Sequence, residues 1–315
     1  MKKKVFIDGS EGTTGLRIFE RFESRDDIEL LKIPSELRKD PVEVKKYINE
    51  SDITFLCLPD AAAREAVAMV ENENTIILDT STAHRTEAGW AYGYPELSAA
   101  HREAIRTGKR IAVPGCYATG FITTAYALVA GGILPKDYPV SAFAVSGYSG
   151  GGKKMIAQYQ AQDKEKELSS ARLYALSQSH KHLKEMKAIS GLERTPLFSP
   201  MVTDYYSGMT VSLTFYADML NGRQTPETVR EYLAKHYAGE KFITVQPLGA
   251  ESESGGVLFS SARSGWDGLE IYVTGNEDRI MVTTRFDNLG KGASGAAIQC
   301  MNIVLGCEED KGLTV

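Results

Sequence analysis

The fold is decided by the opening stretch Lys4-Val5-Phe6-Ile7-Asp8-Gly9-Ser10-Glu11-Gly12-Thr13-Thr14-Gly15. Residues 4–8 predict a short apolar strand, and apolar residues after the turn recur at helical spacing. A glycine-rich turn between a strand and a helix lets the backbone approach a pyrophosphate, which rests on the helix N-terminus. The spacing GxxGxxG departs from the commoner GxGxxG, so the turn alone fits either a dinucleotide site or a tight turn. The residues expected to contact the cofactor are Gly9, Ser10, Gly12, Thr13, Thr14 and Gly15.

The segment after the second predicted strand, residues 29–33, indicates which dinucleotide is bound. An NAD-selective enzyme often has an acidic residue at the end of this strand, to hold the ribose 2′-hydroxyl. Here Ser35, Arg38 and Lys39 follow the strand, and a hydroxyl and two cations suit a 2′-phosphate. Glu36 argues for NAD, and Arg38 also fits a solvated surface. We predict NADP(H) as the cofactor.

The α/β pattern continues toward the middle of the chain. Further strands are predicted over 53–58, 75–79 and 110–113, and Asp40-Pro41 predicts a helix N-terminus. The polar loop after strand 75–79 lies at the carboxyl end of a parallel strand, where open α/β sheets bind ligands. We expect Ser81 and Thr82 to face the nicotinamide end of the cofactor and Arg85 to meet an anionic substrate. The alternative for this loop is a capped turn with an exposed arginine.

The strand at 110–113 leads into Val113-Pro114-Gly115-Cys116-Tyr117-Ala118-Thr119-Gly120. Apolar residues at three- and four-residue steps follow, so Cys116 is placed in the first turn of a helix. Unpaired N–H groups and the helix dipole favour a thiolate there, which makes Cys116 a candidate nucleophile. The alternative is a small buried cysteine in a tight turn.

Two later segments carry further candidate residues. The strand at 140–146 runs into Gly147-Tyr148-Ser149-Gly150-Gly151-Gly152, which fits either an anion-binding loop or a flexible one. Ser146, Ser149 and Gly150 are the substrate-binding candidates. His180 and His182 are two residues apart, and a helix would point them to different sides, which makes them poor joint metal ligands. One of them is a candidate acid/base, and exposed histidines at a helix start are the alternative.

Size and charge limit the class of protein. The chain has 315 residues, 43% hydrophobic and 24% charged, which fits one large domain or two smaller ones. A net charge of −5 argues against a nucleic-acid partner, and no apolar run is long enough for a membrane span. The four cysteines form no CxxC pair, so we expect neither a zinc site nor a disulfide framework. We expect the protein to be cytoplasmic. From Pro196 onward close-spaced strands are predicted over 197–203, 209–216, 269–274 and 279–286. They indicate a second, α+β domain with a mixed or antiparallel sheet beside the Rossmann-type domain.

Four motifs after the glycine turn resemble the N-acetyl-γ-glutamyl-phosphate reductases, NADP-dependent enzymes of arginine biosynthesis. They are PGCYAT at 114–119, SGYSGGGKK at 146–154, HKHxxE at 180–185 and NLGKGASGAA at 288–297. The third motif here reads HKHLKE, and the loop motif departs from the commoner SGxSGAGR at Gly151 and Lys153. The resemblance spans Gly9 to about Gln299 and corresponds to the shorter form of the family.

This resemblance implies roles for individual residues. Cys116 matches the nucleophile, His180 the acid/base, and Glu185 a carboxylate that orients it or contacts substrate. The glycine turn and Asn288 match NADP contacts. The family fold implies a Rossmann domain over 1–117 with 289–315, a catalytic and dimerisation domain over 118–288, and a homo-oligomer, dimer or tetramer. Which of His180 and His182 is the working base stays open.

The reaction implied is attack of the Cys116 thiolate on an acyl phosphate, loss of phosphate, and reduction of the thioester to a semialdehyde. The nearest alternative is aspartate-semialdehyde dehydrogenase, which shares fold and chemistry but usually carries NCxT at the cysteine. A non-catalytic NADP-binding sensor is the alternative from another class. It has no need for both Cys116 and the His180 segment.

Overall fold

The computed structural model describes residues 2–315, and the chain divides into two compact units. The first unit runs up to Gly115 and resumes from Ala293 to Leu313. The second unit comprises Cys116–Gly292 and the last two residues. The predicted boundaries, after Tyr117 and before Leu289, lie two and four residues from these crossings, so Cys116 falls in the second unit.

The first unit is built on a parallel six-stranded sheet in the order β2-β1-β3-β4-β6-β5, which confirms the Rossmann-type prediction. The chain leaves β1 for β2 and then returns to β3 on the other side, so the direction of winding changes between β1 and β3. Such a switch point is where doubly wound sheets bind ligands. The strands are β1 (Lys3–Asp8), β2 (Ile28–Leu31), β3 (Ile53–Leu56), β4 (Ile76–Asp79), β5 (Ala91–Tyr92) and β6 (Arg110–Ala112).

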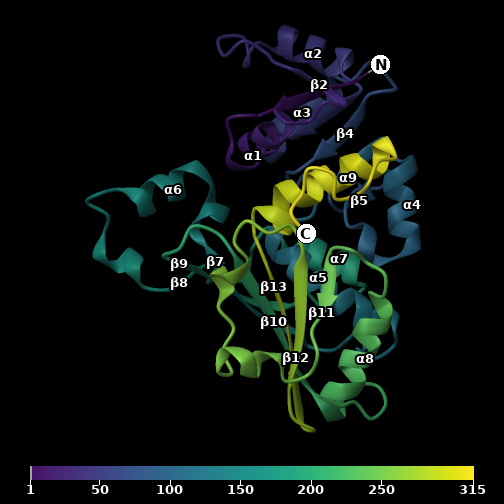
Figure 1. Ribbon diagram of the computed structural model, residues 1–315, viewed down its shortest axis with the longest axis vertical. Helices are drawn as coiled ribbons and strands as arrows, with labels where there is room; N and C mark the ends of the chain where they lie inside the picture. The colour runs from purple at the N-terminus through teal and green to yellow at the C-terminus, as the bar shows by residue number, and fades with distance from the viewer. Residues whose placement is uncertain (1) are drawn as a thin grey trace. The chain divides into compact units, whose positions relative to one another are not determined.

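Helices cover both faces of this sheet (Figure 1). Alternate side chains of β1 point to opposite faces, so Val5 and Ile7 enter one apolar core while Phe6 enters another. The helices α1 (Thr13–Phe22), α4 (Ala99–Thr107) and α9 (Gly295–Leu305) contribute to the first core, and α2 (Pro41–Glu50) and α3 (Asp60–Ala68) to the second. Asp40 accepts a hydrogen bond from the Val42 N–H at 2.9 Å, which confirms the predicted N-cap of α2.

The second unit is built on a mixed seven-stranded sheet in the order β11-β12-β13-β10-β7-β9-β8. Pairs β7/β9 and β11/β12 are parallel and the other four are antiparallel, which confirms the predicted mixed sheet. The strands are β7 (Ser141–Gly147), β8 (Arg172–Leu173), β9 (Leu197–Thr203), β10 (Met209–Tyr216), β11 (Ile243–Val245), β12 (Leu269–Gly275) and β13 (Arg279–Phe286).

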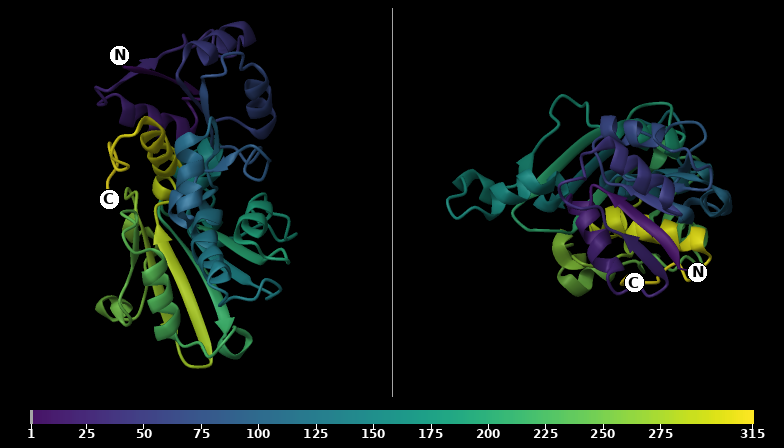
Figure 2. Two further views of the ribbon diagram at one scale, coloured as in Figure 1. Left: turned by 90° about the vertical axis from the view of Figure 1, so that its right-hand side faces the viewer. Right: turned by 90° about the horizontal axis from the view of Figure 1, so that it is seen from above.

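Helices cover one face of this sheet (Figure 2). The other face bears exposed side chains. The helix α5 (Cys116–Ala130) packs on β10 and β13, α7 (Leu183–Ser190) packs on α5, and α8 (Pro226–His236) packs on β11 and β12. Val211, Leu213 and Phe215 of β10 are buried, whereas the alternate residues Thr214 and Tyr216 are exposed. The remaining α-helix of the described residues, α6 (Gly152–Gln160), belongs to the segment between β7 and β9.

Candidate active site

The candidate nucleophile Cys116 is the first residue of α5 and is half-buried. The backbone N–H groups of the first helical turn and the helix dipole therefore surround its sulfur with positive potential, which favours the thiolate. A Cβ placed on Gly292 would lie only 2.9 Å from the Cys116 Cβ. The backbone of the NLGKGASGAA motif thus passes directly against the nucleophile, at a position where only glycine fits.

The ring of Tyr117, next to the nucleophile, collects aromatic neighbours. Its centroid lies 5.2 Å from that of Phe198 and 5.6 Å from that of His180, with both rings close to perpendicular to it. His182 and Tyr174 are slightly farther away, at 6.0 and 6.4 Å. The structure therefore brings the predicted acid/base segment to the residue that follows Cys116.

The two histidines lie side by side, which corrects the expectation that a helix separates them. The helix α7 begins only at Leu183, so neither histidine is inside it, and the two ring centroids are 4.7 Å apart. The backbone N–H of His182 donates to His180 Nδ1 at 3.1 Å. A neutral His180 therefore carries its proton on Nε2, where it can donate a hydrogen bond, whereas proton transfer from the ring requires the imidazolium form. His182 is buried and His180 only partly so.

Glu185 occupies the first turn of α7 and is buried. Because α7 packs on α5, this carboxylate belongs to the same layer of the unit as Cys116. A buried carboxylate is stable only with polar partners, which fits an orienting role. Its contact with His180 or with substrate stays a prediction.

Ser146, Ser149, Gly150 and Asn288 form a second cluster in this unit. The Asn288 amide donates to Ser149 Oγ at 3.0 Å and accepts from the Gly208 N–H at 2.9 Å. A Cβ on Gly150 would lie 3.4 Å from Asn288 Nδ2 and 3.7 Å from Ser146 Oγ. Asn288 therefore holds the serine loop in place. Its contact with the cofactor stays a prediction.

The loop that follows β7 is ordered by backbone hydrogen bonds. The N–H groups of Gly147, Tyr148 and Ser149 donate to carbonyls of residues 208, 205 and 206, each at 3.0 Å. The Gly152 N–H donates to the Ser149 carbonyl. These groups are not available to an anion, so a substrate phosphate would have to bind to the remaining N–H groups or to the serine hydroxyls.

Two phenols next to the nucleophile stay protonated. Burial raises the pKa of Tyr117 well above its usual value, and the nearby Tyr174 and Cys116 add to the increase. Burial also raises the pKa of Tyr174. Both hydroxyls are therefore hydrogen-bond donors at any working pH. Tyr117 belongs to the PGCYAT motif, but it was not among the predicted site residues.

The glycine turn of the first unit has the close packing that a dinucleotide site requires. Gly9 has a φ of +81°, and a Cβ there would lie 2.4 Å from the Cys57 carbonyl oxygen at the end of β3. A Cβ on Gly15 would lie 2.4 Å from the Gly9 carbonyl oxygen. The N-terminus of α1 has no side-chain cap at Gly12, and the buried Thr13 Oγ1 has no hydrogen-bond partner among the described residues. Open donors at a helix N-terminus fit a pyrophosphate.

The residues predicted to select NADP face the same turn. Arg38 forms an ion pair with Glu11, and Ser35 Oγ donates to the same Glu11 oxygen at 3.4 Å. Both Ser35 and Arg38 follow β2, the neighbour of β1 in the sheet. Glu11 was not among the predicted site residues, because nothing in the sequence indicates that it reaches across to Arg38.

The loop after β4 is held by its own side chains. Asp79 accepts from the Ser81 N–H at 2.9 Å and from Ser81 Oγ at 2.7 Å, and the Thr82 N–H donates to Asp60 at 2.9 Å. Arg85 is buried, and it donates to the carbonyls of Val113 at 2.8 Å and Thr80 at 2.9 Å. The alternative of an exposed arginine is therefore wrong. Contacts of these residues with cofactor or substrate stay predictions.

Asp8, the residue before the glycine turn, is expected to make stability depend on pH. Burial raises its pKa to about 6, from an ordinary value near 3.8. The folded state therefore loses stability as pH rises from about 4 to 6, because the unfolded chain releases this proton more easily. Asp8→Asn should remove this pH-dependent loss of stability and raise the free energy of unfolding at pH 7 by up to about 3 kcal/mol.

Urea unfolding of both proteins at pH 5 and pH 7 checks this prediction. The difference in the free energy of unfolding between Asp8→Asn and wild type should be larger at pH 7 than at pH 5. Asp26 is exposed, so Asp26→Asn should show no such pH-dependent difference. A gap independent of pH would contradict a desolvated carboxylate.

Two features are absent from the described residues, 2–315. No three His, Cys, Asp or Glu side chains there gather closely enough to hold a metal ion. No helix in that range is long and apolar enough to cross a membrane.

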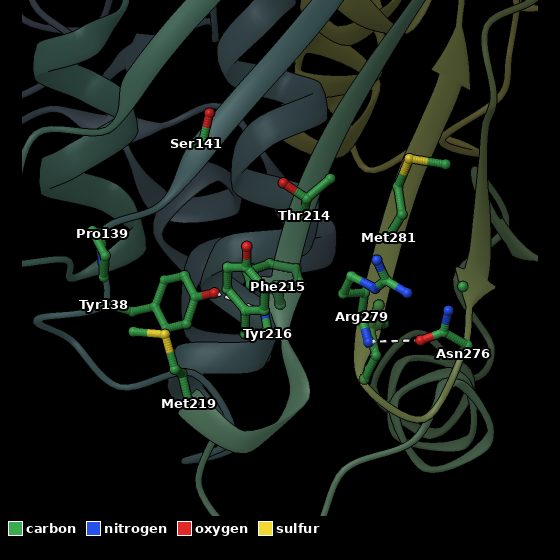
Figure 3. A pocket seen from close by; sticks show the side chains of 12 residues that line it. Tyr138, Pro139, Ser141, Thr214, Phe215, Tyr216, Met219, Asn276, Arg279 and Met281 are labelled. Carbon is green, nitrogen blue, oxygen red and sulfur yellow. Dashed lines mark hydrogen bonds between the residues drawn. The ribbon is translucent and has the colours of Figure 1, made fainter.

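A cavity of about 440 Å³ in the second unit lies away from the cluster around Cys116. It opens on the exposed sheet face, between Tyr138, Tyr216 and Met219 on one side and Asn276, Arg279 and Met281 on the other (Figure 3). It includes Ser141 at the start of β7, whereas Ser146 lies five residues farther along the strand, about 17 Å away. None of the predicted site residues lines it.

Comparison with known proteins places the chain in a family. The family model described as "Semialdehyde dehydrogenase, NAD binding domain" matches residues 4–106, and "Semialdehyde dehydrogenase, dimerisation domain" matches 116–288. Among solved structures, aspartate semialdehyde dehydrogenase from Francisella tularensis has a TM-score of 0.73 at 15% identity, covering 97% of this chain and 100% of that one. Aspartate semialdehyde dehydrogenase II from Vibrio cholerae has a TM-score of 0.72 at 15% identity, covering 97% and 99%. These structures support the fold.

Relatives in sequence are closer. N-acetyl-γ-glutamyl-phosphate reductase 2 of Nostoc sp. (strain PCC 7120 / SAG 25.82 / UTEX 2576) is 44% identical over 99% of both chains. N-acetyl-γ-glutamyl-phosphate reductase of Brucella ovis (strain ATCC 25840 / 63/290 / NCTC 10512) is 44% identical over 97% of this chain and 100% of its own. With the cysteine, histidine and glycine-turn geometry in place, the chain belongs to the N-acetyl-γ-glutamyl-phosphate reductase family of the semialdehyde dehydrogenases.

Proposed function

We propose that this chain reduces N-acetyl-γ-glutamyl phosphate to N-acetylglutamate semialdehyde with NADPH, releasing phosphate, as a step of arginine biosynthesis. The proposal rests on one observation. Cys116 is the first residue of α5, and the ring of the next residue, Tyr117, packs against the ring of His180. A helix N-terminus favours the thiolate, and a histidine nearby supplies a proton at neutral pH. The relatives at 44% identity bear the name of this activity.

In the first half of the reaction, the Cys116 thiolate attacks the acyl carbon of the mixed anhydride. The C–S bond forms as the bond between acyl carbon and phosphate oxygen breaks, so phosphate leaves and a thioester remains. Ser146 and Ser149 are the hydroxyls proposed to bind the substrate. Ser146 lies near the end of β7, and Ser149 lies in the loop that Asn288 holds in place.

In the second half, the protein handles a proton. The glycine turn, with Ser35 and Arg38, would hold NADPH, and the bound coenzyme would supply the hydride that reduces the thioester. We assign His180 as the acid/base, because its ring lies against Tyr117 beside Cys116 and because in the neutral ring Nδ1 accepts from the His182 N–H, which leaves Nε2 for proton transfer. In its imidazolium form His180 protonates the developing oxyanion from Nε2, and the resulting neutral ring takes the proton back as the C–S bond breaks and the aldehyde leaves. Such general acid/base catalysis contributes about 10²–10⁴-fold.

The reverse reaction tests the substrate. With phosphate and NADP, N-acetylglutamate semialdehyde should give a kcat/KM at least about 100-fold above that of aspartate semialdehyde, because sites built for one polar group reject analogues that lack it. NADPH formation at 340 nm is the measurement. A higher kcat/KM with aspartate semialdehyde would establish the alternative reductase instead.

We further propose that the chain self-associates through the exposed face of the second sheet. Leu197, Ser141, Thr214 and Met281 lie in register across four neighbouring strands, and Leu197 is 59% exposed. Phe143 and Tyr216 add apolar surface to the same face, which also holds the cavity of Figure 3. The family model that matches this unit is described as a dimerisation domain. An exposed apolar face of this kind fits a second copy of the chain.

Leu197→Glu is expected to shift the chain from oligomer to monomer, because it places a charge in the middle of the proposed interface. Sedimentation velocity at micromolar concentration is the measurement. Val42→Glu is the matched control, since Val42 is also exposed but belongs to the first unit. An unchanged sedimentation coefficient in Leu197→Glu would rule out this face. Dimer or tetramer, and the cytoplasmic location, remain predictions.

A further inference from the structure

The glycine turn carries an acidic side chain that its phosphate-binding role does not require. Glu11 lies between Gly9 and Gly12, and the Gly12 N–H donates to the Gly9 carbonyl at 2.9 Å, which fixes the backbone around it. The turn also sits on the Cys57 carbonyl at the end of β3. The Glu11 backbone is therefore held firmly, and only its side chain is free to change direction.

The Glu11 carboxylate engages the two groups that would hold a 2′-phosphate. It pairs with the Arg38 guanidinium and accepts from Ser35 Oγ. Both side chains of the ion pair are largely exposed, Arg38 by 40% and Glu11 by 52%. A pair this exposed is weak and exchanges readily for another anion.

We propose that Glu11 is a specificity-determining residue, which competes with the 2′-phosphate of NADP(H) for Arg38 and Ser35. The inference rests on the proposed use of NADPH. A 2′-phosphate carries more than one negative charge near pH 7, so it must displace the carboxylate from Arg38 and then remain close to it. NADH has no such phosphate and meets no such competition. Glu11 thus lowers the preference of the site for NADPH over NADH without removing it.

Glu11→Gln tests the inference, since glutamine keeps the shape and the bond from Ser35 but carries no charge. The dissociation constants of NADPH and NADH, measured by coenzyme fluorescence on the whole protein without substrate, are the readout. NADPH should bind about five- to tenfold more tightly to Glu11→Gln than to wild type, and NADH should change by less than about twofold. Glu20→Gln removes the same charge from an exposed residue of α1 to which no coenzyme contact is assigned, and it should leave the ratio unchanged.

Arg38→Ala completes the experiment. In that background Glu11→Gln should no longer improve NADPH binding, because the contested cation is gone. Unchanged or weaker NADPH binding in Glu11→Gln, or an improvement that persists without Arg38, would overturn the inference. A different result is expected if the proposal of NADPH as the coenzyme is itself wrong. A wild type that prefers NADH, and loses NADH affinity in Glu11→Gln, would instead make Glu11 the ribose-binding acid of an NAD enzyme.

Discussion

Cys116→Ser is expected to lower kcat/KM for acyl-phosphate reduction by about 10⁴-fold or more, while NADPH still binds. The start of α5 favours a thiolate, but a serine hydroxyl is too weak an acid to ionise there. An oxygen ester would also accept hydride less well than a thioester. Initial rates and coenzyme fluorescence on the same preparation separate the loss of chemistry from any loss of binding.

Two other cysteines serve as controls for this variant. Burial raises the pKa of the Cys57 thiol to about 12, so iodoacetamide should alkylate Cys116 well before Cys57. Cys307→Ser, in the C-terminal segment of the first unit, should keep its activity. Activity close to wild type in Cys116→Ser would exclude the covalent route.

Gly292→Ala is expected to lower kcat by about 100-fold while the protein stays folded. The new methyl carbon would lie 2.9 Å from the Cys116 Cβ and 3.2 Å from the Asp287 carbonyl oxygen. Cys116 opens a buried helix and cannot retreat far, so its sulfur is displaced from the position of attack. The rate of Cys116 alkylation and kcat should fall together.

Gly131→Ala is the matched control, because its Cβ would clash with the Tyr232 ring, 2.3 Å away, just past the other end of α5. It should lower the thermal midpoint without changing the alkylation rate of Cys116. If Gly292→Ala retained full kcat, the contact between the NLGKGASGAA motif and Cys116 would have no catalytic consequence.

Strands with a clear alternation of apolar and polar residues were predictable from the sequence. The bounds predicted for β9, β10 and β13 agree with the structure, because one face of that sheet is packed and the other exposed. The order of the strands was not predictable. The strand β7 lies between β10 and β9, and such long-range pairing depends on packing that local patterns do not encode.

The site divides in the same way. Cys116 at a helix start and the glycine turn at a strand end follow from local spacing, and the structure has both. The contact of Tyr117 with His180 and that of Cys116 with Gly292 join segments more than 60 residues apart. The buried position of Arg85 was not predictable for a similar reason. Its hydrogen bonds to the Val113 and Thr80 carbonyls form only because the ends of two strands, β6 and β4, meet in the folded sheet.

The covalent thioester on Cys116 is tested most directly by the reverse reaction without phosphate. Enzyme mixed rapidly with N-acetylglutamate semialdehyde and NADP should form about one NADPH per Cys116 in a burst and then nearly stop, because the acyl group stays on sulfur until phosphate removes it. Adding phosphate should restore steady turnover, and Cys116→Ser should show no burst. NADPH formation that begins only when phosphate is added, with no burst before it, would contradict the thioester mechanism.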